Sequence, residues 1–126
     1  MSKLHFLRAL TPQQKITLLT ETTHKLFLEG KRIQIQAPSD AALTYIDELL
    51  WVYKPEAFLP HAIASSQSLE PIVLTKEATN LNKADILIHL LPGTPPSGFA
   101  EVYDLLDETT SEKQATAEAK IKALSI

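Results

Sequence analysis

A nearly continuous apolar run at residues 84–91 constrains the fold of this chain more than any other feature of the sequence. Apart from Asp85 and His89, every residue in the run is apolar. Such a run is typical of a strand that is buried on both faces, as strands of parallel sheets are. Parallel strands need long crossover connections, which are usually helices. The run therefore predicts an α/β protein.

Helical patterns and shorter strand-like runs alternate along the rest of the chain. Thr11, Ser39 and Ser111 are suited to cap the starts of three helices. Gln14 and Gln114 complete capping-box patterns with the first and third of these residues. The remaining candidate strands are residues 3–7, 32–37, 58–64, 71–75 and 101–106.

This order of elements predicts the architecture. Strands that alternate with helices imply right-handed crossovers and a sheet with helices on both faces. We therefore expect a Rossmann-like three-layer α/β sandwich with a mostly parallel sheet of about five strands. The chain has 126 residues, and a domain usually has about 100–200. We expect a single α/β domain over residues 1–126.

Composition excludes several classes of function. The sequence has no cysteine, which excludes disulfides, zinc–thiolate sites and cysteine nucleophiles. The net charge is −3, whereas a general nucleic-acid binder needs a clustered positive field, so we expect no direct nucleic-acid contact. The N-terminus lacks the apolar core of a signal peptide, and no apolar run reaches the ~20 residues of a membrane helix. We expect a cytoplasmic protein without a membrane partner.

No residue pattern predicts a cofactor or metal. The glycines, at positions 30, 93 and 98, are absent from the junction of the first strand and helix, where a dinucleotide-binding loop requires them. Asp85 and His89 share a strand face but are too few for a closed metal site. Asp104, Asp107 and Glu108 are candidate acid–base groups, although such a group is more often a solvated strand end. A small nucleotide-binding or hydrolytic enzyme on the same fold stays open as the alternative.

The most distinctive segment is residues 49–61, which holds the single tryptophan. Trp51 and Phe58 are large aromatic residues beside two prolines, Pro55 and Pro60, and the segment ends at His61. Aromatic residues held by proline turns often anchor protein–protein contacts. The other interpretation is that Trp51 and Phe58 fill the end of the core.

The spacing within this segment resembles a pattern of the chi subunit of bacterial DNA polymerase III, L-W-x-x-x-P-x-x-F-x-P-H. The matching residues are Leu50, Trp51, Pro55, Phe58, Pro60 and His61. Residues 30–32, 40–50 and 84–88 resemble further segments of the family in the same order. The resemblance covers about residues 3–122.

The resemblance implies a protein without catalytic activity of its own, and any polymerase activity belongs to its complex. The chi subunit is an accessory subunit of the clamp loader in DNA replication, with a Rossmann-like parallel sheet. It pairs with the psi subunit and binds the acidic C-terminal tail of single-stranded DNA-binding protein. It thereby links the clamp loader to coated template.

The resemblance also implies two sets of site residues. Trp51 and Phe58 match aromatic positions that dock psi, or a helicase that competes for the same surface, and Pro55, Pro60 and His61 shape that site. The tail-binding site would comprise Leu106, Lys113, Lys120, Ile121 and Lys122. Arginines and tyrosines of the family's last helix are missing here, so a solvated helix face without tail binding stays open.

Overall fold

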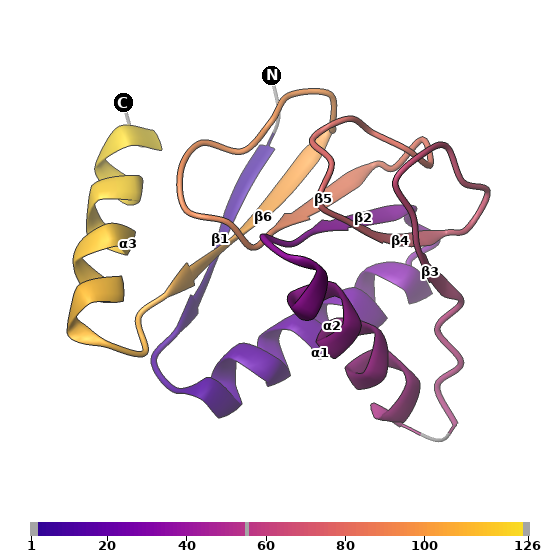
Figure 1. The fold of residues 1–126 in the computed structure, drawn as a ribbon, viewed down its shortest axis with the longest axis horizontal. Coiled ribbons are helices and arrows are strands. Elements are labelled where there is room, and N and C mark those ends of the chain that lie inside the picture. Colours follow the sequence, from indigo (N-terminus) through magenta and orange to yellow (C-terminus); the bar gives the residue numbers. More distant parts are fainter. Residues whose placement is uncertain (1–2, 55, 125–126) are drawn as a thin grey trace.

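The computed structural model describes residues 3–54 and 56–124, which form six strands and three helices (Figure 1). In chain order the elements are β1 (Lys3–Ala9), α1 (Pro12–Leu28), β2 (Ile33–Gln36), α2 (Asp40–Val52), β3 (His61–Ile63), β4 (Ile72–Thr75), β5 (Ile86–His89), β6 (Glu101–Asp107) and α3 (Ser111–Leu124). The order predicted from the sequence is confirmed.

The strands form one sheet in the order β1-β6-β5-β2-β4-β3, and all the pairings are parallel. The predicted α/β fold is confirmed, with six strands where about five were expected. The run at residues 84–91 contributes β5, which pairs with β2 on one side and β6 on the other. All four residues of β5 are buried, as the apolar run predicts.

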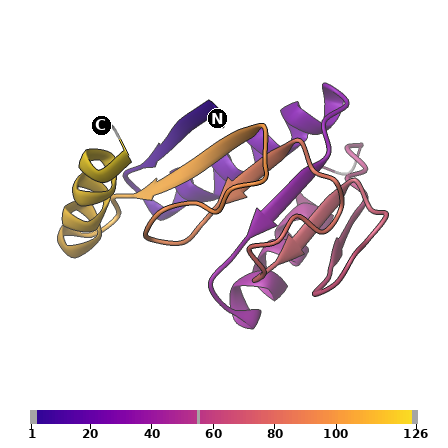
Figure 2. The same ribbon diagram turned by 90° about the horizontal axis from the view of Figure 1, so that it is seen from above.

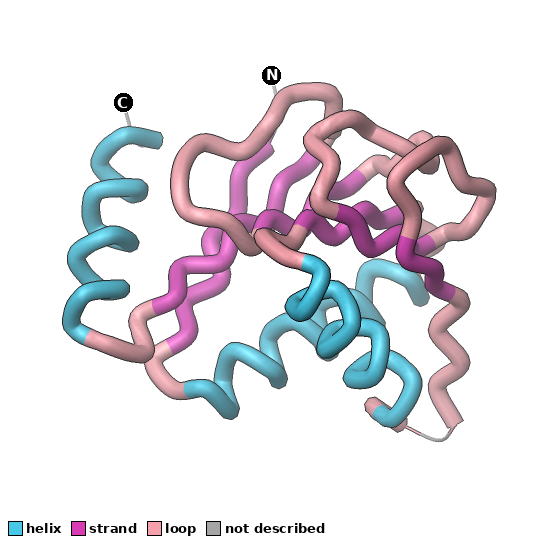
Figure 3. The backbone as a smooth tube through the Cα atoms, in the orientation of Figure 1, coloured by secondary structure: helices cyan, strands magenta, loops and turns pink. Residues whose placement is uncertain are grey.

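The two faces of the sheet are covered differently. The β1–β2 and β2–β3 crossovers move across the sheet in the same direction and carry α1 and α2, so right-handed connections place both helices on one face. The connections from β3 to β6 return in the opposite direction, and they are loops (Figure 3). The expectation of helices on both faces therefore holds only in part, because loops supply most of the third layer.

The main core lies between the sheet and the pair α1 and α2. Strand residues of β2, β4 and β5 pack there against Leu19 and Leu26 of α1 and against Leu43, Ile46 and Leu50 of α2. A smaller cluster on the other face joins Phe99, in the loop before β6, to strand residues of β5 and β6. Both faces of the central strands are thereby removed from water, which is the main stabilising term of the fold.

Helix α3 stands apart from α1 and α2, beyond the carboxyl end of β6 (Figure 2). Its buried residues are Ala117 and Lys120. Lys120 meets Asp104 of β6, which lies on the same strand face as Val102 of the loop-covered cluster, because alternate residues share a face. Helix α3 therefore belongs to the third layer, with the loops.

The caps of α1 and α2 are those predicted. The Thr11 side chain accepts a hydrogen bond from the Gln14 backbone N–H, and the Ser39 side chain accepts one from Ala42. The predicted cap of α3 is wrong by one residue. Thr110 Oγ1 accepts from the Lys113 N–H, and Ser111 is the first helical residue.

Candidate functional site

Trp51 and Phe58 form an exposed aromatic surface, the name used below for these two residues. Trp51 lies in the last turn of α2 and is 56% exposed, and Phe58, in the loop that follows, is 71% exposed. Their ring centroids are 6.4 Å apart. Leu50 and Leu59, each 2% exposed, fill the core instead. The interpretation of Trp51 and Phe58 as core-filling residues is therefore wrong.

His61 lies beneath this surface rather than on it. Its side chain is fully buried, with Nδ1 2.6 Å from the Leu59 carbonyl oxygen and Nε2 3.0 Å from Asp47 Oδ1. Its ring centroid is 4.6 Å from that of Trp51. His61 therefore supports Trp51 and has no surface of its own to offer a partner. Pro60 is half-buried, and Pro55 lies outside the described residues.

A second feature is a pocket of about 520 Å³ at the carboxyl ends of β2, β5 and β6, here called the interhelix pocket. Side chains of α1, α2 and α3 line it together with residues that follow the strands. Most of its lining is apolar, including Ile46 and Leu49 of α2, Leu90 and Leu91 after β5, and Leu106 of β6. Ligands of open parallel sheets bind at this edge.

The residues expected to bind an acidic tail are only partly brought together. Leu106, Lys113 and Lys120 line the interhelix pocket, whereas Ile121 and Lys122 are not among its lining residues. Ile121 is half-buried, and Lys122 is exposed. Lys113 is at the mouth of the pocket with half of its side chain exposed.

Lys120 has partners inside the protein. Its Nζ lies 2.5 Å from Asp104 Oδ1 and donates to the Leu91 carbonyl oxygen at 2.6 Å. His89 Nδ1 lies 2.9 Å from the same Asp104 oxygen. All three side chains are 5% exposed or less. The Lys120 ammonium therefore joins α3 to the sheet and is not free for a ligand.

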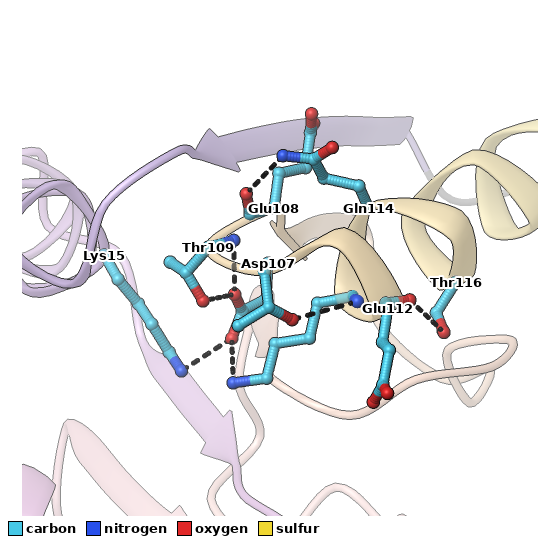
Figure 4. A network of polar contacts seen from close by, with 9 residues as sticks. Lys15, Asp107, Glu108, Thr109, Glu112, Gln114 and Thr116 are labelled. Atoms are coloured by element: carbon cyan, nitrogen blue, oxygen red, sulfur yellow. Dashed lines mark hydrogen bonds and ion pairs between the residues drawn. The ribbon is translucent and has the colours of Figure 1, made fainter.

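Asp107 draws two lysines to the mouth of the pocket. Its Oδ2 is 2.8 Å from Lys15 Nζ and 3.3 Å from Lys113 Nζ, while its Oδ1 accepts hydrogen bonds from the N–H and Oγ1 of Thr109 (Figure 4). Burial raises the pKa of the Asp107 carboxyl, but the hydrogen bonds from Lys15 and Thr109 outweigh burial and hold that pKa well below its usual range. The sequence carries no signal for Lys15, because 92 positions separate it from Asp107.

This arrangement predicts an acid-dependent contribution to stability. Because the folded-state pKa of Asp107 is depressed, its contribution is present above the ordinary carboxyl pKa of about 4 and is lost as the pH falls below it. Urea unfolding of wild type and Asp107→Asn should show a difference that shrinks between about pH 5 and pH 2. Asp40, whose side chain is exposed, provides the control for loss of a surface carboxylate: at neutral pH, Asp40→Asn should change stability little. A pH-independent difference for Asp107→Asn would contradict the prediction.

In the part of the chain that the structure describes, the three candidate acid–base carboxylates each pair with a different basic side chain. Asp104 and Asp107 have separate partners, and Glu108 accepts from the Arg8 guanidinium. Asp85 accepts from the Arg32 backbone N–H, apart from His89. Within residues 3–54 and 56–124, no three His, Asp or Glu side chains gather as a metal ion would need. In the same part of the chain, no helix is long and apolar enough to cross a membrane.

The chain is thus a parallel α/β protein with an exposed aromatic surface and an apolar pocket that lysines rim. The family model described as DNA polymerase III chi subunit, HolC, matches residues 1–124. The chain therefore belongs to the family of DNA polymerase III chi subunits. It is 27% identical over 107 residues to DNA polymerase III subunit chi of Pseudomonas aeruginosa, covering 82% of this chain and 75% of the relative. The same subunit of Haemophilus influenzae is 26% identical over 98 residues, which cover 74% of this chain and 68% of that relative.

Proposed function

We propose that this chain is a non-catalytic adaptor of the DNA polymerase III holoenzyme. It binds the psi subunit of the clamp loader at the aromatic surface and the C-terminal tail of single-stranded DNA-binding protein at the interhelix pocket. A helicase that competes with psi would use the same aromatic surface. Membership in the chi family supports a role as a replication accessory subunit.

The observation that carries the proposal is the exposure of Trp51 and Phe58, each of which has one buried chain neighbour, Leu50 and Leu59 respectively. Leaving a tryptophan and a phenylalanine in water forgoes the burial free energy of two large side chains. Tryptophan is enriched among the residues that dominate protein–protein binding. Trp51 lies on the last turn of α2 and Phe58 in the loop after it, so that both rings lie on one surface.

The interhelix pocket suits an acidic tail that ends in an apolar residue. Its lining is largely apolar, and Lys113 stands at its mouth. An acidic peptide would meet positive charge there, and its apolar terminal residue would enter the apolar interior. The missing arginines on α3 reduce the bidentate contacts open to such a peptide.

Fluorescence anisotropy of a labelled tail peptide tests this part of the proposal. We expect saturable binding that weakens as salt rises, because exposed charges are screened. Lys113→Ala should weaken binding about fivefold, or ~1 kcal/mol, as expected for a partly exposed ion pair. Lys122→Ala, on the same helix but outside the pocket lining, should leave binding unchanged. Equal losses in both variants would assign the site to the helix face instead, and absence of binding would refute tail recognition.

A further inference from the structure

Two ammonium groups from distant parts of the chain meet at one carboxylate oxygen at the mouth of the interhelix pocket. Lys15 of α1 and Lys113 of α3 both contact Asp107 Oδ2, at 2.8 and 3.3 Å. The two bonds from Thr109 to Oδ1 fix the other side of that carboxylate. In Figure 4, Lys15 and Thr109 approach Asp107 from different elements. The carboxylate therefore holds two like charges close together that would otherwise repel each other.

The cluster of Lys15, Lys113 and Asp107 can bind a second anion. Two ammonium groups and one carboxylate leave a net charge of +1. Each ammonium has three N–H donors, and one contact of each is made to Asp107. The side chains of Lys15 and Lys113 are 42% and 51% exposed. A second carboxylate can therefore reach both lysines without displacing Asp107.

The neighbouring apolar wall selects the kind of carboxylate. Lys15, Asp107 and Lys113 line the same pocket as Leu49 and Leu106. The C-terminal residue of a peptide carries an apolar side chain and a free carboxylate on one Cα. Unlike an internal residue, the C-terminal residue can place its side chain in the pocket and its own carboxylate at the lysines, while the chain continues from its amino side only.

We infer that Lys15, together with Lys113, binds the terminal carboxylate of the acidic tail, so that the tail site spans α1 as well as α3. This inference rests on the proposed function of the pocket and adds a residue outside the last helix and the preceding strand. Lys15 is thereby a specificity-determining residue for peptides that end in the pocket.

A double-mutant cycle tests it. One change is Lys15→Met in the full chain, and the other is amidation of the C-terminus of the tail peptide. Wild type should bind the amidated peptide about tenfold more weakly than the free-acid peptide. Lys15→Met should bind the free-acid peptide about fivefold more weakly than wild type does. For Lys15→Met, amidation should cost threefold or less, because a partner of the carboxylate is already gone. Thermal unfolding of the variant shows whether the fold is kept.

Lys25→Met provides the matched control. Lys25 is an exposed lysine in the last turn of the same helix and does not line the pocket. Lys25→Met changes the net charge by the same amount as Lys15→Met. Because Lys25 lies outside the pocket lining, the effects of Lys25→Met and of amidation should be additive. If amidation costs Lys15→Met the full tenfold, the inference is wrong while tail binding stands. If wild type binds neither peptide, the proposed tail function fails and the inference fails with it.

Discussion

Replacing Lys120 by methionine is expected to lower the free energy of unfolding by about 3–5 kcal/mol, because it leaves the Asp104 carboxylate buried without its main counter-charge. Methionine keeps most of the apolar stem of lysine, so lost packing contributes little. Helix α3 has Ala117 as its other buried residue, so the same change should loosen the helix from the sheet. Urea unfolding followed by circular dichroism measures the effect.

Lys122→Met is the matched control for this experiment. It removes the same charge from the same helix at an exposed position, and a surface change of this kind is usually within about 0.5 kcal/mol. A loss below 1 kcal/mol for Lys120→Met would show that the buried contact with Asp104 contributes little. The double variant Lys120→Met with Asp104→Asn should lose less than the sum of the single changes, because the pair is then removed as a unit.

Lys120 also shows where sequence reasoning about the site fails. Lysine is almost never fully buried unless it is paired, so a lysine on a polar helix is naturally assigned to solvent or to a ligand. Its partner Asp104 is on β6, and the third member, His89, ends β5. No local pattern connects the three. The fold alone brings them together, and it removes Lys120 from the set of open binding residues.

The elements of the fold were more predictable than their arrangement. Apolar periodicity and capping residues act over a few positions, which is why the starts of α1 and α2 and the central strand β5 follow from the sequence. The return connections from β3 to β6 are loops, and no local signal states which face of the sheet they cover. The Lys15–Asp107 contact could not be predicted either, because no local signal connects residues 92 positions apart.

The residues of segment 49–61, which the sequence singles out, lie in different surroundings. Trp51 and Phe58 are exposed, whereas the His61 side chain is buried between Asp47 and the Leu59 carbonyl oxygen. The L-W and F-x-P-H spacing therefore combines two exposed aromatic residues with a buried histidine that packs against one of them. A sequence pattern does not distinguish the exposed residues from the buried one, since both kinds belong to the same segment.

Trp51→Ala and Phe58→Ala are each expected to weaken binding of the psi subunit by about 30-fold or more, which corresponds to at least ~2 kcal/mol for a central aromatic contact. Isothermal titration calorimetry with purified psi measures the loss. Because both side chains are exposed, the midpoint of urea unfolding should barely change. Loss of binding together with loss of stability would instead indicate a structural role.

Leu10→Ala is the matched control, because Leu10 is as exposed as Trp51, at 57% against 56%, and follows β1 at the opposite edge of the sheet. It should leave psi binding unchanged. His61→Gln should weaken binding less than Trp51→Ala does, because His61 acts through the Trp51 ring 4.6 Å away. It should also change the fluorescence of Trp51, the single tryptophan. A full loss of binding in His61→Gln with unaltered tryptophan fluorescence would contradict this supporting role and assign His61 a direct contact.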